Sequence, residues 1–255
     1  MDLGLISDIH GNRPALEAVL ADGADDVDEF VCLGDIVGYG PWPSECVHLI
    51  QQHCETVIQG NHDREALDPE GYTDNETAMA GLRYAEEELI TANLVWLQSR
   101  PRRTDLLDGD ALLVHDHPEQ VDRYVMPRGF PEVRPHLDDY EACFLGHTHI
   151  QHEAVIDDRL ILNPGSVGQP RDGDSRAAYA VVDTDTWETD LRRVEYDIET
   201  VQREVAEEGL PPKSGNAWPA DADGRTGTAP RGPLTGRAIR RRAVTGASSG
   251  GRCRR

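Results

Sequence analysis

The chain has 255 residues, 38% of them hydrophobic, and a formal net charge of −22, which suits one large domain or two small ones with a real core. Such an acidic balance argues against nucleic-acid binding by the folded part of the chain. No apolar run approaches 18 residues and the first residues lack the segments of a signal peptide, so we expect a cytoplasmic protein without a membrane partner.

Apolar runs bounded by turn residues predict five β-strands in the first 145 residues, at 3–6, 30–33, 56–58, 111–114 and 142–145. Helical spacing of apolar residues predicts helices at 14–21, 43–53 and 75–98, and Pro14 suits the first turn of a helix. Two hairpins follow, at 152–163 with Asp157 and Asp158 in the turn, and at 177–196. This alternation of strands and helices predicts an α/β sandwich.

A side chain able to bind a metal follows the end of each of the five strands. In chain order these side chains are Asp8 and His10, then Asp35, then Asn61, then His115, and finally His147 and His149. One such group would commonly form only a turn, but five turns that all contain Asp, Asn or His indicate a shared function. Because ligands bind beyond the carboxyl ends of strands in α/β sheets, we expect these side chains to form one site.

The donor set limits the metals that this site would take. Carboxylate, amide and imidazole groups without a thiolate suit Mn, Fe, Zn, Co or Mg, and of these we favour Mn. Seven candidate ligands are too many for one ion, whereas two divalent ions about 3.5–4 Å apart with a shared carboxylate would use them all. Such pairs bind phosphate and generate hydroxide near neutral pH.

The motifs DIH, GDIVGYG, GNHD, VH and GHTH, in this order, resemble those of the calcineurin-like metallophosphoesterase superfamily. The resemblance covers about residues 1–200, and LNPGSVGQPRDGD at 162–174 is similar to the small phosphodiesterases of bacteria and archaea. It implies a four-layer α/β/β/α sandwich of two mixed β-sheets flanked by helices, which we expect to occupy residues 1–212.

The resemblance also implies a role for each motif residue. One metal ion would be held by Asp8, His10 and His149, the other by Asn61, His115 and His147, and both by Asp35. A hydroxide bridging the two ions would attack phosphorus in line. His62 would contact the phosphate and either stabilise or protonate the leaving oxygen.

Three residues near these motifs have two interpretations each. Asp63 would either orient the preceding histidine as part of the catalytic group or cap the helix that begins there. Asn12 would either bind the substrate phosphate or shape a turn. Arg171 would either bind the substrate phosphate or pair with Asp172 or Asp174.

Two departures from related sequences bear on function. Ser/Thr protein phosphatases of the superfamily carry the pattern GDxVDRG, where this chain has Gly38 and Tyr39, so a protein phosphatase is not expected. Tyr39, Pro41 and Trp42 would either wall a pocket for a small substrate or pack within a loop. His117 stands close to the VH motif, and we expect it to face solvent rather than compete as a ligand.

We therefore expect a metal-dependent phosphoric ester hydrolase acting on a small substrate, with phosphodiesters preferred because of the family resemblance. Phosphomonoesters and dinucleoside polyphosphates are alternative substrates. The non-enzymatic alternative is a protein-binding scaffold, since the superfamily includes a retromer subunit with the same fold. The complete ligand set together with His62 favours catalysis.

The end of the chain differs in composition from the rest. Residues 216–255 contain nine arginines and two acidic residues and are rich in Gly, Pro, Ser, Thr and Ala. We expect a disordered tail from residue 213 onward, which would either bind an acidic partner or be an aberrant extension, for instance from a shifted reading frame. The acidic remainder, with Lys213 as the one lysine of the chain, resembles proteins of salt-loving organisms. The five cysteines include no CxxC pair, so no disulfide framework is expected.

Overall fold

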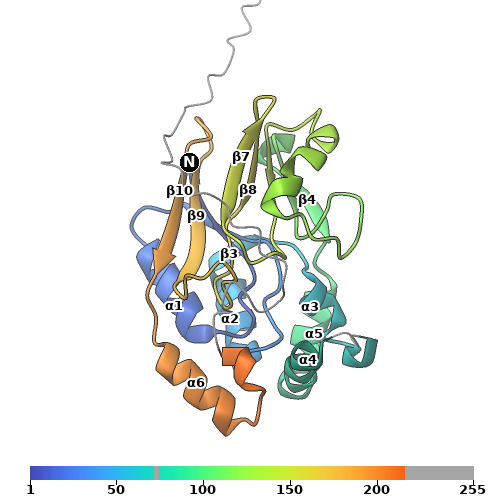
Figure 1. Ribbon diagram of the computed structural model, residues 1–255, viewed down its shortest axis with the longest axis vertical. Helices are drawn as coiled ribbons and strands as arrows, with labels where there is room; N and C mark the ends of the chain where they lie inside the picture. The colour runs from blue at the N-terminus through green and yellow to red at the C-terminus, as the bar shows by residue number, and fades with distance from the viewer. Residues whose placement is uncertain (72–74, 216–255) are drawn as a thin grey trace, which may run out of the picture.

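The computed structural model describes residues 1–71 and 75–215 (Figure 1). Its strands are β1 (Asp2–Ile6), β2 (Glu29–Cys32), β3 (Cys54–Val57), β4 (Arg103–Leu106), β5 (Ala111–Val114), β6 (Ala142–Phe144), β7 (His152–Ile156), β8 (Arg159–Asn163), β9 (Ala177–Asp183) and β10 (Thr189–Val194). Its α-helices are α1 (Arg13–Asp22), α2 (Pro43–His53), α3 (Asn61–Glu65), α4 (Glu76–Glu88), α5 (Thr91–Gln98) and α6 (Ile198–Glu207). The 3-10 helices are η1 (Pro69–Gly71), η2 (Leu107–Gly109), η3 (Pro127–Glu132), η4 (Arg134–His136) and η5 (Pro212–Gly215).

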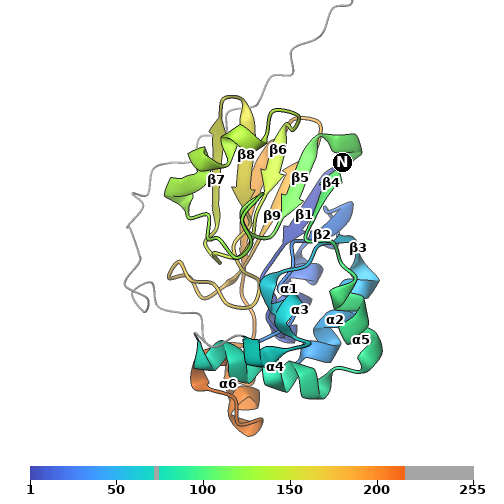
Figure 2. The ribbon, with the colours of Figure 1, turned by 90° about the vertical axis from the view of Figure 1, so that its right-hand side faces the viewer.

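The strands form two mixed sheets of five strands each, in the orders β10-β9-β1-β2-β3 and β4-β5-β6-β8-β7. β1, β2 and β3 are parallel in the first sheet, and β5, β6 and β8 are parallel in the second. The two predicted hairpins are present as the antiparallel pairs β7–β8 and β9–β10. Figure 2 shows the second sheet toward the viewer, with β9 and β1 of the first sheet behind it.

The space between the sheets is filled by apolar side chains from both of them. Leu3 and Leu5 of β1 lie there with Leu113 of β5 and Phe144 of β6, and all four side chains are fully buried. Each such side chain contributes roughly 1.5–3 kcal/mol through removal from water. This core fixes the two sheets face to face and so brings the carboxyl ends of their parallel strands together.

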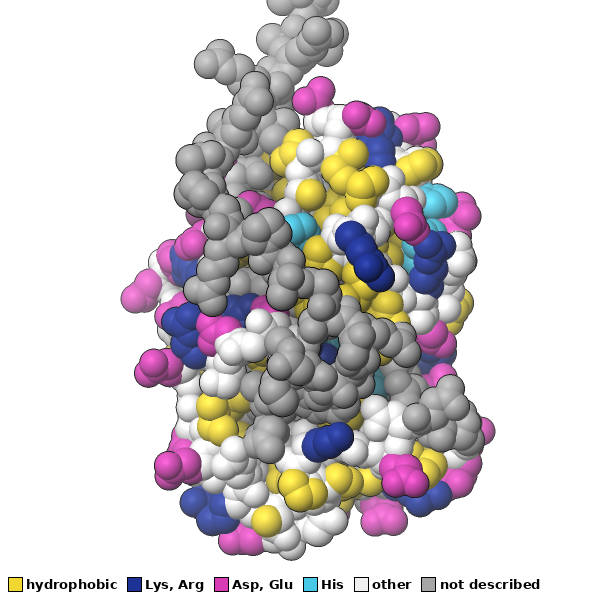
Figure 3. Space-filling view, in the orientation of Figure 1, with side chains coloured by type: hydrophobic (Ala, Val, Ile, Leu, Met, Phe, Trp, Pro, Cys, Tyr) yellow, Lys and Arg dark blue, Asp and Glu magenta, His cyan; other side chains and the backbone are white. Residues whose placement is uncertain are grey.

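The outer faces of the sheets are covered in two different ways. Helices α1 and α2 cover the first sheet, where Leu16 and Val47 pack into the same core as Cys32 of β2. The second sheet is covered by 3-10 helices and loops, with Phe130 of η3 packed against Leu112. The predicted α/β/β/α sandwich is confirmed, with short 3-10 helices as its second outer layer. Acidic side chains lie mainly around the outline of the face shown in Figure 3, with basic side chains among them.

Several elements differ from the prediction. The helix expected at 75–98 is two helices, because Leu89 and Ile90 adopt extended backbone angles between α4 and α5. Strand β4 and helix α6 were not predicted. A short segment joins α6 to η5, where Ser214 is buried, so the boundary expected after residue 212 falls within η5.

The tail predicted for residues 216–255 lies outside the described residues. Four cysteines fall within the described ranges, and all four are buried and free, as expected. Among the described residues, no helix combines the length and the apolar character needed to cross a membrane.

Candidate metal centre

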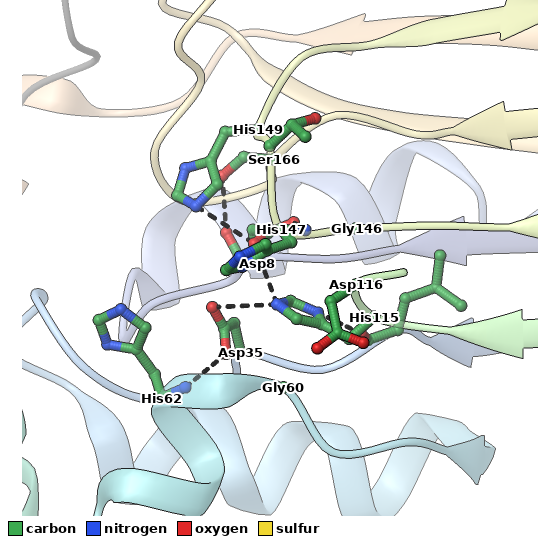
Figure 4. A network of polar contacts seen from close by, with 12 residues as sticks. Asp8, Asp35, Gly60, His62, His115, Asp116, Gly146, His147, His149 and Ser166 are labelled. Carbon is green, nitrogen blue, oxygen red and sulfur yellow. Dashed lines mark hydrogen bonds and ion pairs between the residues drawn. The ribbon is translucent and has the colours of Figure 1, made fainter. Parts of the chain in front are cut away.

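The loops that follow β1, β2, β3, β5 and β6 meet at one edge of the sandwich. They bring together Asp8, His10, Asp35, Asn61, His115, His147 and His149, each of which is at most 4% exposed. Figure 4 shows five of these side chains turned toward one another, with His62 beside them. The sequence placed every one of them directly after a strand, and the parallel strands explain why they converge.

These side chains fall into two groups that share one carboxylate. Asp8, His10, Asp35 and His149 form one group, and Asp35, His115 and His147 form the other. Asp35 Oδ2 lies 3.7 Å from His10 Nε2 and 3.3 Å from His115 Nε2. Asp35 therefore occupies the position between the groups that a bridging ligand requires.

The backbone of five of these residues lies in the left-handed region. Asp8, His10, Asp35, His147 and His149 have φ values of 54°, 49°, 54°, 68° and 58°. Such angles cost free energy in residues other than glycine and concentrate at functional sites. Hydrogen bonds between neighbouring loops hold this conformation, for example from His10 N to Asp35 O at 2.9 Å.

Three of the imidazoles are oriented by backbone carbonyls. The Nδ1 atoms of His10, His115 and His149 lie 3.1, 2.7 and 2.6 Å from carbonyl oxygens. Because a carbonyl only accepts, each Nδ1 carries the proton and each Nε2 faces the cluster, as is common for metal-binding histidines. The Nε2 atoms of His10 and His149 are only 3.0 Å apart, and two lone pairs at that distance repel unless a cation faces both.

The ionisation states of the clustered side chains favour a cation at the centre of the cluster. Burial lowers the pKa of His10 and of His149, which keeps both rings neutral. Burial raises the pKa of Asp8 and of Asp35, but the neighbouring histidines outweigh burial, so both carboxyl groups have lowered pKa values. Burial lowers the pKa of His115, yet the two carboxylates prevail and raise it to about 10.

Asn61, the remaining predicted ligand, has a buried side-chain oxygen, Oδ1, that lacks a hydrogen-bond donor within the described part of the chain. A buried polar atom left in this state costs about 1–3 kcal/mol, and a divalent cation would satisfy it. The orphaned amide oxygen, the facing imidazoles and the hard donor set together fit two divalent ions.

His62 lies beside the cluster, next to His10 and Tyr39. Its ring lies edge-on to His10 at 4.7 Å between centroids and beside Tyr39 at 4.9 Å. Its backbone N–H donates to Asp35 Oδ1 at 2.8 Å, and burial lowers its pKa to about 4. His62 thus borders the cluster without belonging to either ligand group.

Gly38 leaves the space that the His62 ring occupies. A Cβ at this position would lie 2.3 Å from His62 Nδ1, and the φ of +85° further disfavours other residues. We expect Gly38→Ala to displace His62 and to lower turnover by about 100-fold, the cost of a misplacement near 1 Å, while metal content stays the same. Turnover and elemental analysis of the purified variant measure both effects.

The control is Gly209→Ala, which has a similar φ of +69° with nothing within 4 Å of its Cβ position. It introduces comparable backbone strain without a clash, so its turnover should match the parent. Equal turnover of Gly38→Ala and Gly209→Ala would show that the fit between Gly38 and His62 does not matter.

Asp63 has different partners from those expected of a catalytic residue. Its carboxylate accepts hydrogen bonds from the backbone N–H groups of Asp35 at 2.8 Å, Ile36 at 2.8 Å and Gly60 at 3.0 Å. The structure thus shows the helix-capping role, extended to the loop after β2. Asp63 is a positioning residue that ties the start of α3 to the shared ligand Asp35.

The side chain of Asn12 also forms hydrogen bonds to nearby backbone groups. Its Oδ1 accepts from Ala15 N at 3.2 Å and caps α1, while its Nδ2 donates to Gly168 O at 2.9 Å. These contacts are the turn role, and they join the loop after β1 to the segment after β8. The contact of Asn12 with substrate phosphate stays a prediction.

Arg171 lies beside the cluster. It donates to Gln169 Oε1 at 2.8 Å and to the Tyr39 hydroxyl at 3.4 Å, and its guanidinium stands 5.9 Å from the centre of the Tyr39 ring. Asp172 and Asp174, the alternative partners, form ion pairs with Arg193 and Arg176. The positive charge of Arg171 is therefore placed at the edge of the site.

Within the GYGPWP stretch, some residues contact the ligand cluster and others pack the domain. Tyr39 lines the site, with its ring edge-on to His10 at 4.9 Å. Trp42 instead packs against Val201 and Val205 of α6, and Pro41 is buried. Of these three residues, Tyr39 therefore borders the ligand cluster, whereas Trp42 packs the domain.

The expectation for His117 is wrong. Its side chain is buried at 2% exposure rather than solvent-facing. The Nδ1 atom accepts from the N–H groups of Glu119 and Gln120 at 3.2 and 3.3 Å, and the ring lies 5.2 Å from that of His136. His117 thus stabilises the turn after β5 and belongs to neither ligand group.

Sequence reasoning missed three residues that shape the site. Asn163 Nδ2 donates to Gly146 O at 2.6 Å, and Ser166 Oγ donates to Asp8 O at 2.7 Å, so the segment after β8 holds two ligand loops. Their place in NPGS, at the end of a buried strand and just after it, is the signal that could have identified them. Tyr124 stacks on His147 with ring centroids 4.0 Å apart, and no motif marks it.

The fold and the clustered polar side chains match a known class of phosphoesterases. The family model of the calcineurin-like phosphoesterase superfamily domain matches residues 1–187, and the chain belongs to this superfamily, as predicted.

Three relatives illustrate the match. The chain is 35% identical to the uncharacterized protein MJ0912 of Methanocaldococcus jannaschii over 232 residues, which cover 82% of this chain and 93% of that protein. It is 29% identical to the phosphodiesterase YfcE of Escherichia coli over 197 residues, covering 72% and 89%. The crystal structure of a metallophosphoesterase from Sphaerobacter thermophilus superposes with a TM-score of 0.72 at 36% identity, covering 84% of this chain and 97% of that one.

Proposed function

We propose that this protein is a phosphodiesterase that uses two divalent metal ions. The observation that carries the proposal is the sharing of Asp35 by two buried ligand groups, because a shared carboxylate is the hallmark of paired-ion phosphoesterase sites. The similarity to the phosphodiesterase YfcE supports diesters as the substrate class. Among the suitable metals we propose Mn, which matches a mixed carboxylate, amide and imidazole set.

The predicted ligands would be divided between the two ions of such a site. One ion would be held by Asp8, His10 and His149, the other by Asn61, His115 and His147, and both by Asp35. When bound, the ions would neutralise phosphate charge and lower the pKa of a water molecule that acts as nucleophile.

Two basic side chains would act on the substrate itself. His62 lies beside the cluster without belonging to a ligand group, so it would donate a hydrogen bond or a proton to the leaving oxygen. Arg171, held by Gln169 and Tyr39, would bind a non-bridging phosphate oxygen with its planar guanidinium. The burial of the ligands keeps bulk water from screening these interactions.

The test is hydrolysis by the metal-stripped protein and by the protein reloaded with Mn²⁺, assayed in high salt. The substrates are a diester, a monoester and a dinucleoside polyphosphate. We expect diester hydrolysis only after reloading. Preference for the monoester or the polyphosphate would reject the diester assignment, and no hydrolysis of any substrate by the reloaded protein would favour the binding scaffold.

Metal binding should also stabilise the fold. At a free ion concentration of 100 times Kd, a ligand that binds only the folded state adds about 2.7 kcal/mol. For a domain of this size that corresponds to a rise in Tm of roughly 5–10 °C. Thermal unfolding with and without Mn²⁺ measures the rise, with Ca²⁺ as a poorly matched comparison ion. An unchanged Tm at saturating Mn²⁺ would contradict binding at the buried cluster.

A further inference from the structure

An exposed aromatic ring stands directly over one metal-ligand candidate. Tyr124 stacks on His147 at 4.0 Å between centroids with an interplanar angle of 22°, yet its side chain is 45% exposed. Since the ring packs against His147, the exposed surface of Tyr124 is open to a ligand at the same site. Aromatic rings with one exposed face are stacking surfaces for planar ligands.

The loop that carries Tyr124 is fastened to the site. Asp122 N donates to Asp116 Oδ2 at 2.5 Å, and Asp116 is held in turn by Arg102 at 2.9 Å. The carbonyl oxygen of Asp122 lies 3.4 Å from His147 Nε2. The position of Tyr124 relative to the ligand cluster is therefore built into the fold.

Tyr124 and His62 pack against members of different ligand groups. His62 packs against His10 and Tyr39, whereas Tyr124 packs against His147. If His62 serves the leaving oxygen, as in the proposed function, Tyr124 lies nearest to the ester group that stays on the phosphorus. Arg171 interacts with the hydroxyl groups of Tyr39 and Tyr124. A phosphate bound by Arg171 would therefore lie near both rings.

A hollow of about 180 Å³ continues from Tyr124 along the following segment, with Met126 and Arg128 in its wall. Pockets that enclose drug-sized ligands measure about 300–1,000 Å³, so this one suits a single ring system. Arg123, also in the wall, pairs with Glu132. Arg128 is exposed and forms no ion pair with any described residue, which leaves its N–H groups for a ligand.

We propose that Tyr124 and Arg128 form a subsite for the retained organic group of the diester, and that this group is a nucleoside. The base would stack on Tyr124, and its ring nitrogen and carbonyl acceptors would receive hydrogen bonds from Arg128, which offers only donors. This inference rests on the proposed phosphodiesterase function and assigns its substrate class.

The kinetic test compares two diesters with the same leaving group, thymidine 5′-(p-nitrophenyl phosphate) and ethyl p-nitrophenyl phosphate. The parent protein, loaded with Mn²⁺, should favour the thymidine ester in kcat/KM. Tyr124→Leu should lower this preference about tenfold, which corresponds to about 1.4 kcal/mol and lies within the usual range for base stacking. Arg128→Gln should lower it about threefold to tenfold.

Two controls separate stacking from damage to the site. Tyr124→Phe keeps the ring and should keep the preference for the thymidine ester. Arg203→Gln on α6, which removes an arginine that contacts Thr200, should leave the preference unchanged. If Tyr124→Leu lowers both esters equally, Tyr124 supports His147 rather than selecting the substrate, and the subsite is rejected.

A binding measurement tests the subsite without turnover. Calorimetric titration of the Mn²⁺-loaded protein with thymidine 5′-monophosphate and with ethyl phosphate should show tighter binding of the nucleotide, reduced about tenfold in Tyr124→Leu. Absence of diester hydrolysis with this binding preference intact would reject the proposed function and retain the nucleoside subsite. Equal affinity for both phosphates in the parent would overturn the subsite even if diesters are hydrolysed.

Discussion

Asp35→Asn is expected to reduce the metal content of the purified protein from two ions per chain to less than one. The Oδ2 atom of Asp35 lies within 3.7 Å of both His10 Nε2 and His115 Nε2. The substitution replaces a shared anionic oxygen by a neutral amide in a buried site, where charge is screened weakly. Both affinities should fall by at least about 100-fold, more than the usual cost of losing a residue behind the ligands.

Asn61→Ala is the matched comparison, because Asn61 belongs to one side of the cluster only. Its Oδ1 is the orphaned acceptor, so its removal should lower the content from two ions toward one. Asp138→Asn, an exposed carboxylate at 82% side-chain exposure, controls for loss of one negative charge. Elemental analysis after gel filtration gives the three values. Two ions per chain and parental activity in Asp35→Asn would reject the bridging assignment.

The ligand cluster was predictable because it depends on the ends of strands. Asp8, Asp35 and His115 each follow a short buried run, and parallel neighbours in a sheet end at the same edge. Strand order places Asp8 beside Asp35 at the edge of the first sheet and His115 beside the loop after β6 at the edge of the second. Their grouping around Asp35 follows from the close approach of two sheets, which sequence alone indicated only through the family resemblance.

The contacts behind the ligands were not predictable in the same way. Asp63 has the sequence position of a partner for His62, but its carboxylate accepts from the backbone of Asp35 and Ile36. Tyr124 reaches His147 from a segment of loops and 3-10 helices that has no apolar periodicity. Such contacts depend on the paths of loops, and residue type does not determine those paths.

The helical region shows a further limit of pattern reasoning. Residues 75–98 keep apolar residues at helical spacing throughout, yet Leu89 and Ile90 leave the helical conformation. Neither glycine nor proline marks the break. The separate directions of α4 and α5 are set by packing, since Leu82 and Leu97 both enter the core beneath the first sheet. Tertiary packing overrides local helical preference here.

His62→Gln is expected to keep two metal ions and to lose turnover by roughly 10²–10⁴-fold, the usual range for a general acid or a charge-stabilising group. Retention of the metals follows because His62 is in neither ligand group. Its backbone N–H, which donates to Asp35 Oδ1 at 2.8 Å, is preserved by the substitution. Glutamine can still donate a hydrogen bond but cannot transfer a proton. The size of the loss in turnover therefore measures the contribution of proton transfer.

The leaving group decides between the two roles proposed for His62. An alkoxide is a strong base and needs a proton or a strong hydrogen bond to depart, whereas nitrophenolate departs with little help. If His62 assists departure, His62→Gln should lose more turnover on an alkyl diester than on a nitrophenyl diester. An equal loss of turnover on both diesters would indicate that His62 binds the non-bridging oxygens. Turnover at the parental rate on both diesters would show that His62 takes no part in the reaction. His48→Gln, at an exposed position on α2, serves as the control for a histidine outside the site.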